Sequence, residues 1–223
     1  MTTYKYETFA DFFKALDHDP ALYDKFFKHL TINVSQFFRD PNQWKIIREL
    51  IIPQTLKEKR NLKIWSAGCS SGQEPYSFAI TLLEYFPNIR FSILASDIDE
   101  NVLKQAEEGL YKQNDFVTTP PELQAKYFMQ TPKGLKIKDN VKQNIKFKKQ
   151  NLLTEAFDTG FDLIACRNVV IYFTEDTKEK LYKNFYNSLN VGGVLFSGST
   201  EHLFGMKDLG LQAVSSFFYQ KTK

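Results

Sequence analysis

One stretch of this chain restricts its fold more than any other, because it joins two apolar runs through a glycine-containing turn and a helical pattern. Residues 62–67 form the first run, Gly68 and Gly72 lie in the turn, and residues 91–97 form the second run, which ends in Asp97. This order predicts a strand–turn–helix–strand unit that holds a nucleoside at the carboxyl ends of its strands. Asp97 follows Gly72 by 25 residues, close to where an acid that binds ribose hydroxyls is found.

The spacing of the glycines discriminates between nucleotide ligands. It does not follow the G-x-G-x-x-G pattern, whose tight turn receives the pyrophosphate of a dinucleotide. The turn therefore argues against a nicotinamide-dependent oxidoreductase. It suits a nucleoside with an amino-acid tail better, and S-adenosylmethionine is such a nucleoside.

The composition sets limits on class and location. With 223 residues, the chain can bury a full core as one α/β domain. Its net charge of +3 is too small to indicate nucleic acid, and no such partner is expected. Two cysteines are too few for a disulfide framework or a zinc site, so we expect a reducing, cytoplasmic location and no metal. The start of the chain lacks an apolar leader and no apolar run is long enough to cross a membrane.

Apolar runs alternate with helical patterns over most of the chain. Strands are expected at 62–67, 91–96, 161–166 and 194–197, and helices at about 76–86, 100–108 and 175–189. This alternation predicts a doubly wound, mostly parallel sheet with helices on both faces. We expect a short N-terminal helical segment at 1–50 and the ligand-binding domain at 51–223.

The N-terminal segment has helical spacing of aromatic and aliphatic residues. This spacing predicts two short helices between Tyr6 and Leu30. A further helix is expected from Pro41 to about Leu50, where Pro53 stops it.

A basic segment lies within the second part of the chain. Between 126 and 149 there are eight lysines and a single acid, Asp139. Alternating apolar residues such as Ile145 and Phe147 predict small strands that carry the lysines outward. We expect a small antiparallel β-subdomain, inserted at about 124–150, with a cationic face.

Several separated blocks of sequence are typical of one family. They are residues 31–40 (TINVSQFFRD), 65–76 (WSAGCSSGQEPY), 95–99 (ASDID), 166–173 (CRNVVIYF) and 198–201 (GSTE). Together they resemble the chemotaxis receptor methyltransferases of the CheR type. The resemblance implies a class I methyltransferase fold, S-adenosyl-L-methionine as cofactor and S-adenosyl-L-homocysteine as product. It also implies that glutamate side chains on the cytoplasmic helical bundle of a bacterial chemoreceptor are converted to methyl esters.

The chain departs from the family pattern in two places. Members usually carry a longer N-terminal helical domain that helps to grip the receptor, whereas 30 residues precede Thr31 here. The turn at 131–134 is shorter than in members that tether to a receptor pentapeptide. We therefore expect weaker receptor recognition through the N-terminus, unless the chain is trimmed there, and no pentapeptide tethering.

Four residues around the glycine turn are expected to bind the cofactor. Asp97 accepts hydrogen bonds from both ribose hydroxyls, unless it only caps the next helix. Glu74 lies in the first turn of a helix, where it either complements the helix dipole or, as the resemblance assigns, binds the ammonium group. Ala67 and Gly68 either let the backbone approach the ligand or merely form a tight turn.

Two further pairs of cofactor-binding residues follow strands. Asn168 and Val169 end a strand beside the topological switch point, where ligands of such sheets bind. By resemblance, Asn151 and Leu152 line the adenine edge, although an Asn after a strand is more often a turn residue.

The segment before residue 40 supplies the basic residue of the site. The rings of Phe37 and Phe38 should pin this segment and direct Arg39 inward, where its guanidinium suits the carboxylate of the cofactor or of the incoming glutamate. Arg39 is thus assigned to both binding and catalysis. Asn33 and Ser35 are candidate hydrogen-bond donors on the same segment.

The expected chemistry makes few demands on acid–base groups. A glutamate carboxylate is already ionised at neutral pH, so no general base is required. A dry site and in-line alignment lower the barrier. Tyr172 is the second candidate catalytic residue, with its hydroxyl near the methyl group, and a buried core tyrosine is the alternative.

Two other functions stay open. Another S-adenosylmethionine-dependent methyltransferase would act on a nucleic acid or a small molecule, with the lysines binding phosphates. Enzymes that methylate the amino groups of bases usually show Asn-Pro-Pro-Tyr or Asp-Pro-Pro-Tyr where this chain has Arg167-Asn168-Val169. A non-catalytic module would bind S-adenosylmethionine without transferring its methyl group.

Overall fold

The protein is described by a computed structural model that covers residues 6, 8–23, 26, 35–57, 59–198 and 209–223. The chain divides into two compact units, 1–34 and 35–223. In the first unit, helix α1 (Phe9–His18) begins after Thr8, whose side chain accepts a hydrogen bond from the backbone N–H of Asp11. The second helix expected before Leu30 lies partly outside the described residues.

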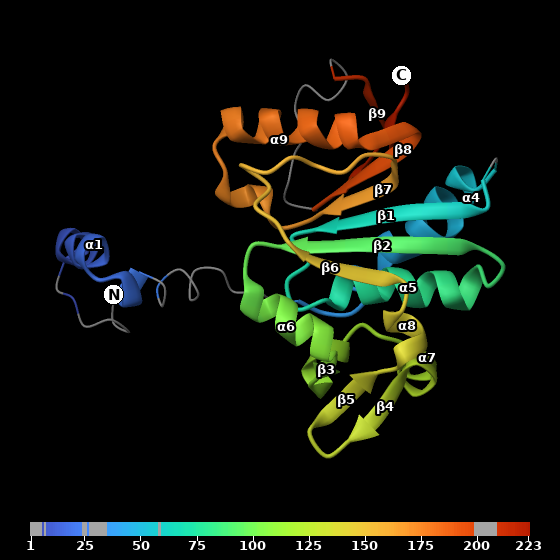
Figure 1. Cartoon of the computed structure of the whole chain (residues 1–223), viewed down its shortest axis with the longest axis horizontal. Helices are drawn as coiled ribbons and strands as arrows, with labels where there is room; N and C mark the ends of the chain where they lie inside the picture. Colours follow the sequence, from blue (N-terminus) through green and yellow to red (C-terminus); the bar gives the residue numbers. More distant parts are fainter. Residues whose placement is uncertain (1–5, 7, 24–25, 27–34, 58, 199–208) are drawn as a thin grey trace. The chain divides into compact units, whose positions relative to one another are not determined.

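Within the described residues, a seven-stranded sheet forms the centre of the second unit (Figure 1). In spatial order its strands are β6 (Ile145–Lys149), β2 (Arg90–Asp97), β1 (Asn61–Ala67), β7 (Phe161–Cys166), β8 (Leu189–Ser197), β10 (Phe218–Lys221) and β9 (Leu211–Ser215). The first five strands are parallel, and β10 and β9 pair antiparallel. The prediction of a mostly parallel, doubly wound sheet is confirmed.

The central strands are buried on both faces. Because successive side chains of a strand point to opposite faces, Ile64 and Trp65 on β1 enter different cores. Ile64 packs with residues of α5 (Gln73–Tyr85), and Trp65 packs with residues of α9 (Glu175–Ser188). Both side chains have no exposed surface. Figure 1 shows α5 and α9 on either side of the central strands.

A small antiparallel sheet lies beyond α5 and α8 (Asp139–Lys142) (Figure 1). Its strands, in spatial order, are β3 (Leu110–Tyr111), β5 (Gly134–Ile137) and β4 (Phe128–Thr131). Helices α6 (Glu100–Glu108) and α7 (Pro121–Tyr127) and a 3₁₀ turn at Gln113–Phe116 connect these strands to the rest. The segment expected as an insert, 124–150, thus contributes to both sheets, because β6 pairs in parallel with β2.

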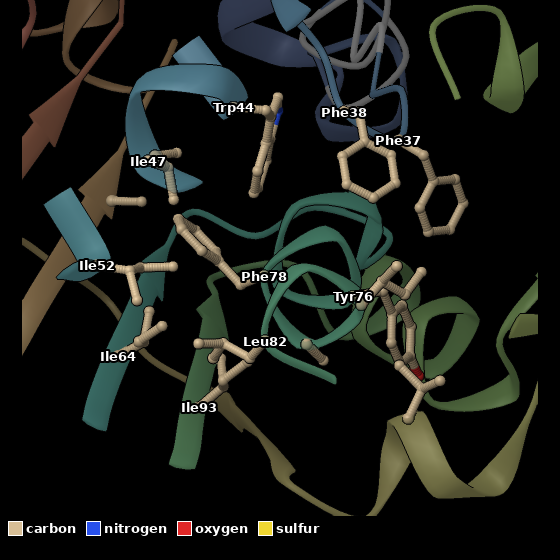
Figure 2. Packing of buried hydrophobic residues seen from close by; sticks show 14 of the residues in the cluster. Phe37, Phe38, Trp44, Ile47, Ile52, Ile64, Tyr76, Phe78, Leu82 and Ile93 are labelled. Carbon is tan, nitrogen blue, oxygen red and sulfur yellow. The ribbon is translucent and has the colours of Figure 1, made fainter. Parts of the chain in front are cut away.

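The helix that begins at Pro41 continues past Pro53, so the predicted stop is wrong. It consists of α3 (Pro41–Ile46), a π-helical turn (Ile47–Ile51) and α4 (Ile52–Thr55). A π-helical turn locally changes the hydrogen-bond pattern, which helps the helix to accommodate a residue that lacks an N–H group. Ile47 and Ile52 are buried in one cluster with Phe78 of α5, as Figure 2 shows. This apolar face stabilises the helix beyond the proline.

Candidate functional site

The site is built where the strand order reverses. From β1 the chain moves outward to β2 and β6, then returns to the other side of β1 with β7 and β8. Loops that leave β1 and β7 therefore diverge at the carboxyl edge of the sheet, where parallel sheets bind ligands. The chain segments that follow Ala67 and Cys166 start from adjacent strands at this switch point.

The turn after β1 is held by backbone contacts and by close packing. The N–H groups of Gly68 and Cys69 donate to the carbonyl oxygen of Ser96, at 2.8 and 2.9 Å. Gly68 has φ +80°, and a Cβ atom placed on it would lie 2.3 Å from Cγ2 of Val169. A residue with a side chain would therefore be strained here and would also collide with Val169. The structure brings Gly68 and Val169 together, as the switch-point argument requires.

Asp97 lies at the end of β2 with its carboxylate over the same turn. It accepts hydrogen bonds from the N–H groups of Ser70 (2.8 Å) and Asp99 (3.1 Å), one on each oxygen. An ionised carboxylate has about four acceptor positions, so roughly two stay available for ribose hydroxyls. The alternative that Asp97 caps the next helix is wrong, because Asp99 caps α6 through the N–H of Asn101.

Burial changes the protonation equilibrium of Asp97. Loss of hydration raises the pKa of its carboxyl group above the ordinary value, and the N–H groups of Asp99 and Ser70 oppose part of this rise. Burial likewise raises the pKa of the neighbouring Cys69 thiol, which is a buried free cysteine. Cys69 is therefore a neutral packing residue in the turn.

Glu74 lies in the first turn of α5, and each of its two carboxylate oxygens contacts another side chain. Its Oε1 accepts a hydrogen bond from Oγ of Ser66 at 2.7 Å, and its Oε2 lies 3.5 Å from Nη1 of Arg167. The N-cap of α5 is Gly72, and no side chain caps the helix there. The carboxylate of Glu74 is thus directed to groups at the ends of β1 and β7 rather than to the backbone of its own helix.

Arg167 is the residue of this site that the sequence analysis did not single out. Its guanidinium donates from Nη2 to the carboxylate of Asp40 and faces Glu74 with Nη1. The side chain is 5% exposed, and its guanidinium carbon lies 4.6 Å from the ring centroid of Phe196. The only sequence signal was a basic residue directly after a buried strand, inside the block at 166–173.

The segment before α3 is fixed by its two phenylalanines. Phe37 is fully buried and stacks on Phe116, with ring centroids 4.8 Å apart and planes 8° apart. The N–H of Phe38 donates to Oγ of Ser77 on α5 at 3.0 Å. The expected pinning by the two rings is confirmed, and Figure 2 shows both rings beside α5.

The pinned segment has an unusual backbone at the residues that flank Arg39. Phe38 and Asp40 both have positive φ, at 53° and 60°. The carbonyl oxygen of Arg39 accepts a hydrogen bond from Nε1 of Trp44 at 2.9 Å, and the Arg39 side chain is half-buried. Ser35 is also half-buried, whereas Asn33 lies outside the described residues.

A sequence model described as "CheR methyltransferase, SAM binding domain" matches residues 33–216, which span the switch point and the pinned segment. The chain belongs to the CheR methyltransferase family. It is 41% identical over 219 residues to a chemotaxis protein methyltransferase of Listeria innocua. These residues make up 98% of this chain and 84% of the relative. A chemotaxis protein methyltransferase of Listeria monocytogenes is 40% identical over the same shares. A probable chemotaxis protein methyltransferase of Rhizobium etli is 38% identical over 79% of this chain and 70% of its own length.

This CheR-family domain has S-adenosylmethionine as its cofactor, and its residues fit that molecule. Asp97 keeps acceptor positions for the ribose, and Glu74 presents a carboxylate that complements an ammonium group. Gly68 lies in the turn near both residues and is half-buried against Val169. Within the described residues of the domain, no cluster of three or more His, Cys, Asp or Glu side chains is placed to hold a metal ion.

The remaining assigned residues of the CheR-family domain fall into two groups. Leu152 and Val169 both pack against the apolar cluster that includes Ala67. Asn151 instead accepts a hydrogen bond from the N–H of Leu153 at 2.9 Å, in a side-chain turn. Asn168 has φ +59° immediately after Arg167.

Tyr172 ends a 3₁₀ turn at Val170–Tyr172, and its side chain lies outside what the structure describes. Among the described helices, none is long and apolar enough to cross a membrane.

Proposed function

We propose that this CheR-family domain transfers a methyl group from S-adenosylmethionine to glutamate carboxylates of a bacterial chemoreceptor. The observation that carries the proposal is the pair of differently held carboxylates, Asp97 and Glu74, on either side of the turn at Gly68. The relatives named as chemotaxis protein methyltransferases support the receptor as substrate. The reaction takes place in the cytoplasm, on the helical bundle of the receptor.

The roles of the residues follow from their charges and positions. Asp97 accepts the ribose hydroxyls, and Glu74 pairs with the ammonium group of the cofactor. Gly68 and Val169 shape the wall near the sulfonium, while Asn151, Leu152 and Asn168 complete the nucleoside pocket, together with Ala67 and Ser35. Catalysis is assigned to residues 51–223 together with the segment that carries Arg39.

The bound cofactor supplies a sulfonium methyl group, whose S–C bond breaks as a C–O bond to the glutamate carboxylate forms. Arg39 binds a carboxylate with its planar guanidinium and so orients the attacking oxygen. Tyr172 is the second residue assigned to catalysis. No residue has to remove a proton, because the attacking carboxylate is ionised at neutral pH. Exclusion of water by the buried strand ends strengthens the attraction between the reacting charges.

The test is incubation of the protein with methyl-labelled S-adenosylmethionine and a cytoplasmic receptor fragment. We expect the label to enter the fragment and to be released as methanol by mild base, as an ester is. A receptor fragment whose glutamates are replaced by glutamine should take up no label. Label that resists base, or that enters RNA or DNA instead, would contradict glutamate esterification.

Binding without transfer to any fragment would contradict enzymatic activity. Calorimetric titration with S-adenosylhomocysteine in the same samples shows whether the protein is competent to bind. A preparation that binds the product and yields no ester is a binding module rather than an enzyme.

A further inference from the structure

A buried arginine connects two carboxylates that lie far apart in the sequence. Arg167 donates to Asp40, which precedes it by 127 residues, and faces Glu74, which precedes it by 93 residues. The side chain of Arg167 is 5% exposed, compared with 18% for Glu74 and 42% for Asp40. The guanidinium is thus the buried centre of the trio, and the carboxylates approach it from outside.

The guanidinium has little freedom to rotate. Its face lies over the ring of Phe196, 4.6 Å from the ring centroid, and two different nitrogens serve the two carboxylates. A planar group with a fixed array of donors can hold two partners at a defined angle, which a lysine ammonium cannot do. The position of Glu74 is therefore coupled to that of the segment that includes Arg39 and Asp40.

The formal charges of the trio are complementary to the expected ligand. Two carboxylates and one guanidinium leave one negative charge unbalanced at the end of β7. The ammonium group at the amino-acid end of S-adenosylmethionine carries one positive charge. Oγ of Ser66 holds the other oxygen of Glu74 at 2.7 Å, so both oxygens are oriented before the ligand arrives.

We propose that Arg167 is a positioning residue that orients Glu74 toward the ammonium group of the cofactor and ties the Arg39 segment to it. This inference rests on the proposed role of Glu74. Arg167 acts through Glu74 and therefore governs affinity for the amino-acid end of the ligand. It has no effect on the ribose end, which Asp97 binds.

Two ligands distinguish the amino-acid end of the cofactor site from its ribose end. S-adenosylhomocysteine carries the amino-acid tail, whereas 5′-methylthioadenosine has the same nucleoside without it. The measurement is the dissociation constant of each ligand by calorimetry for the wild-type protein, Arg167→Gln and Arg167→Lys. We expect Arg167→Gln to lower the affinity for S-adenosylhomocysteine on the order of tenfold, the size of one charge-assisted hydrogen bond. The affinity for 5′-methylthioadenosine should stay within about twofold of the wild-type value.

Arg167→Lys provides the second measurement if the glutamine variant does not fold. It keeps the positive charge but loses the planar array of donors, so we expect an intermediate loss for S-adenosylhomocysteine alone. A lysine variant that matches the wild-type protein for both ligands, or an equal loss for both ligands in either variant, would overturn the positioning role.

Two controls separate failure of this inference from failure of the site. Glu74→Gln should reduce affinity for S-adenosylhomocysteine selectively, and if it does not, the assignment of Glu74 fails. If Glu74→Gln is selective and Arg167→Gln is not, only the positioning role fails. Lys59→Gln removes an ion pair with Asp162 at the amino ends of the strands, so it should lower stability without changing the ratio of the two affinities.

Discussion

The two edges of the central sheet both contain a carboxylate that is largely removed from solvent, and the protein satisfies these carboxylates differently. At the amino edge, Asp162 accepts hydrogen bonds from Nζ of Lys59 (2.5 Å), the N–H of Lys63 (3.0 Å) and Nδ2 of Asn190 (2.7 Å). At the carboxyl edge, Asp97 accepts two backbone hydrogen bonds and keeps acceptor capacity. The same chemical group is structural where three donors, two of them side chains, surround it, and is available to a ligand where two backbone N–H groups hold it.

The backbone conformation also differs between the two edges of the sheet. Among the described residues near the amino edge, those with positive φ are glycines, such as Gly160 and Gly192. At the carboxyl edge, Ser70 and Asn168 also have positive φ, at 49° and 59°. Side chains at such angles cost free energy, and they persist where the surrounding structure over-determines them, often at functional sites. A hollow of about 540 Å³ at the amino edge, lined by residues such as Lys63 and Arg90, lacks this feature.

The largest effect is expected from Asp97→Ala. It removes the acceptor of two ribose hydroxyls, each a charge-assisted hydrogen bond worth about 1.5–3 kcal/mol, so affinity for S-adenosylhomocysteine should fall at least about 100-fold. Calorimetric titration measures the loss. A fall of less than tenfold in a folded variant would show that the two edges do not differ as described.

Asp162→Ala should affect stability instead of binding. It leaves Lys59, Asn190 and the N–H of Lys63 without their acceptor, which should lower the free energy of unfolding by about 2–4 kcal/mol. Urea denaturation measures this change, and calorimetry on the folded variant should give an unchanged dissociation constant for S-adenosylhomocysteine. A selective loss of affinity would place a ligand-binding role at the amino edge as well.

Gly68→Ala tests the close packing at the carboxyl edge. The positive φ and the contact with Val169 should together reduce the free energy of unfolding by about 1–3 kcal/mol. Adding Val169→Ala removes the collision but not the backbone strain, so the double variant should recover part of the loss relative to Gly68→Ala. Urea denaturation of both single variants and the double variant measures the coupling. Additive effects would show that the two residues are not in contact.

The smallest effect is expected from pH. Burial raises the pKa of Asp97. Protonation of its carboxyl group should therefore begin to weaken the binding of 5′-methylthioadenosine at a higher pH than the ordinary pKa of about 3.9 implies. The affinity falls as the pH falls, by up to about tenfold per unit below the shifted pKa, because only the ionised carboxylate accepts from both hydroxyls. The contribution of Asp97 to folding has the opposite sign, since the raised pKa stabilises the fold at low pH and this stabilisation is lost as the pH rises. Titrations at about pH 5 and pH 7.5 measure the binding effect, and Asp97→Ala should lack it.

The positions of Asp97 and Glu74 could be predicted because each is tied to a strand or helix end by local sequence. A strand that ends in an acid, and a glycine turn that opens a helix, place both at the carboxyl edge whatever the rest of the chain does. The burial of Phe37 was predictable for a similar reason, since two adjacent aromatic residues in a loop rarely face water. The parallel sheet followed from the alternation of strands and helices.

The role of Arg167 and the course of the helix through Pro53 depend on contacts that are distant in sequence. Nothing local indicates that Arg167 meets Asp40 and Glu74, because both partners come from other segments. Local rules also end a helix near Pro53, whereas burial against Phe78 outweighs them. Distant packing was thus the information that the sequence pattern lacked.

Because β6 belongs to the central sheet, its lysines lie along an edge of that sheet. In the described part of the chain, β6 is the last strand on its side of the sheet, and Lys146 and Lys149 are exposed along it. An open strand presents unused backbone groups to any similar strand of another molecule. Lysine side chains along an open edge disfavour such pairing, so Lys146 and Lys149, which also forms an ion pair with Glu100 at 2.8 Å, oppose edge-to-edge aggregation.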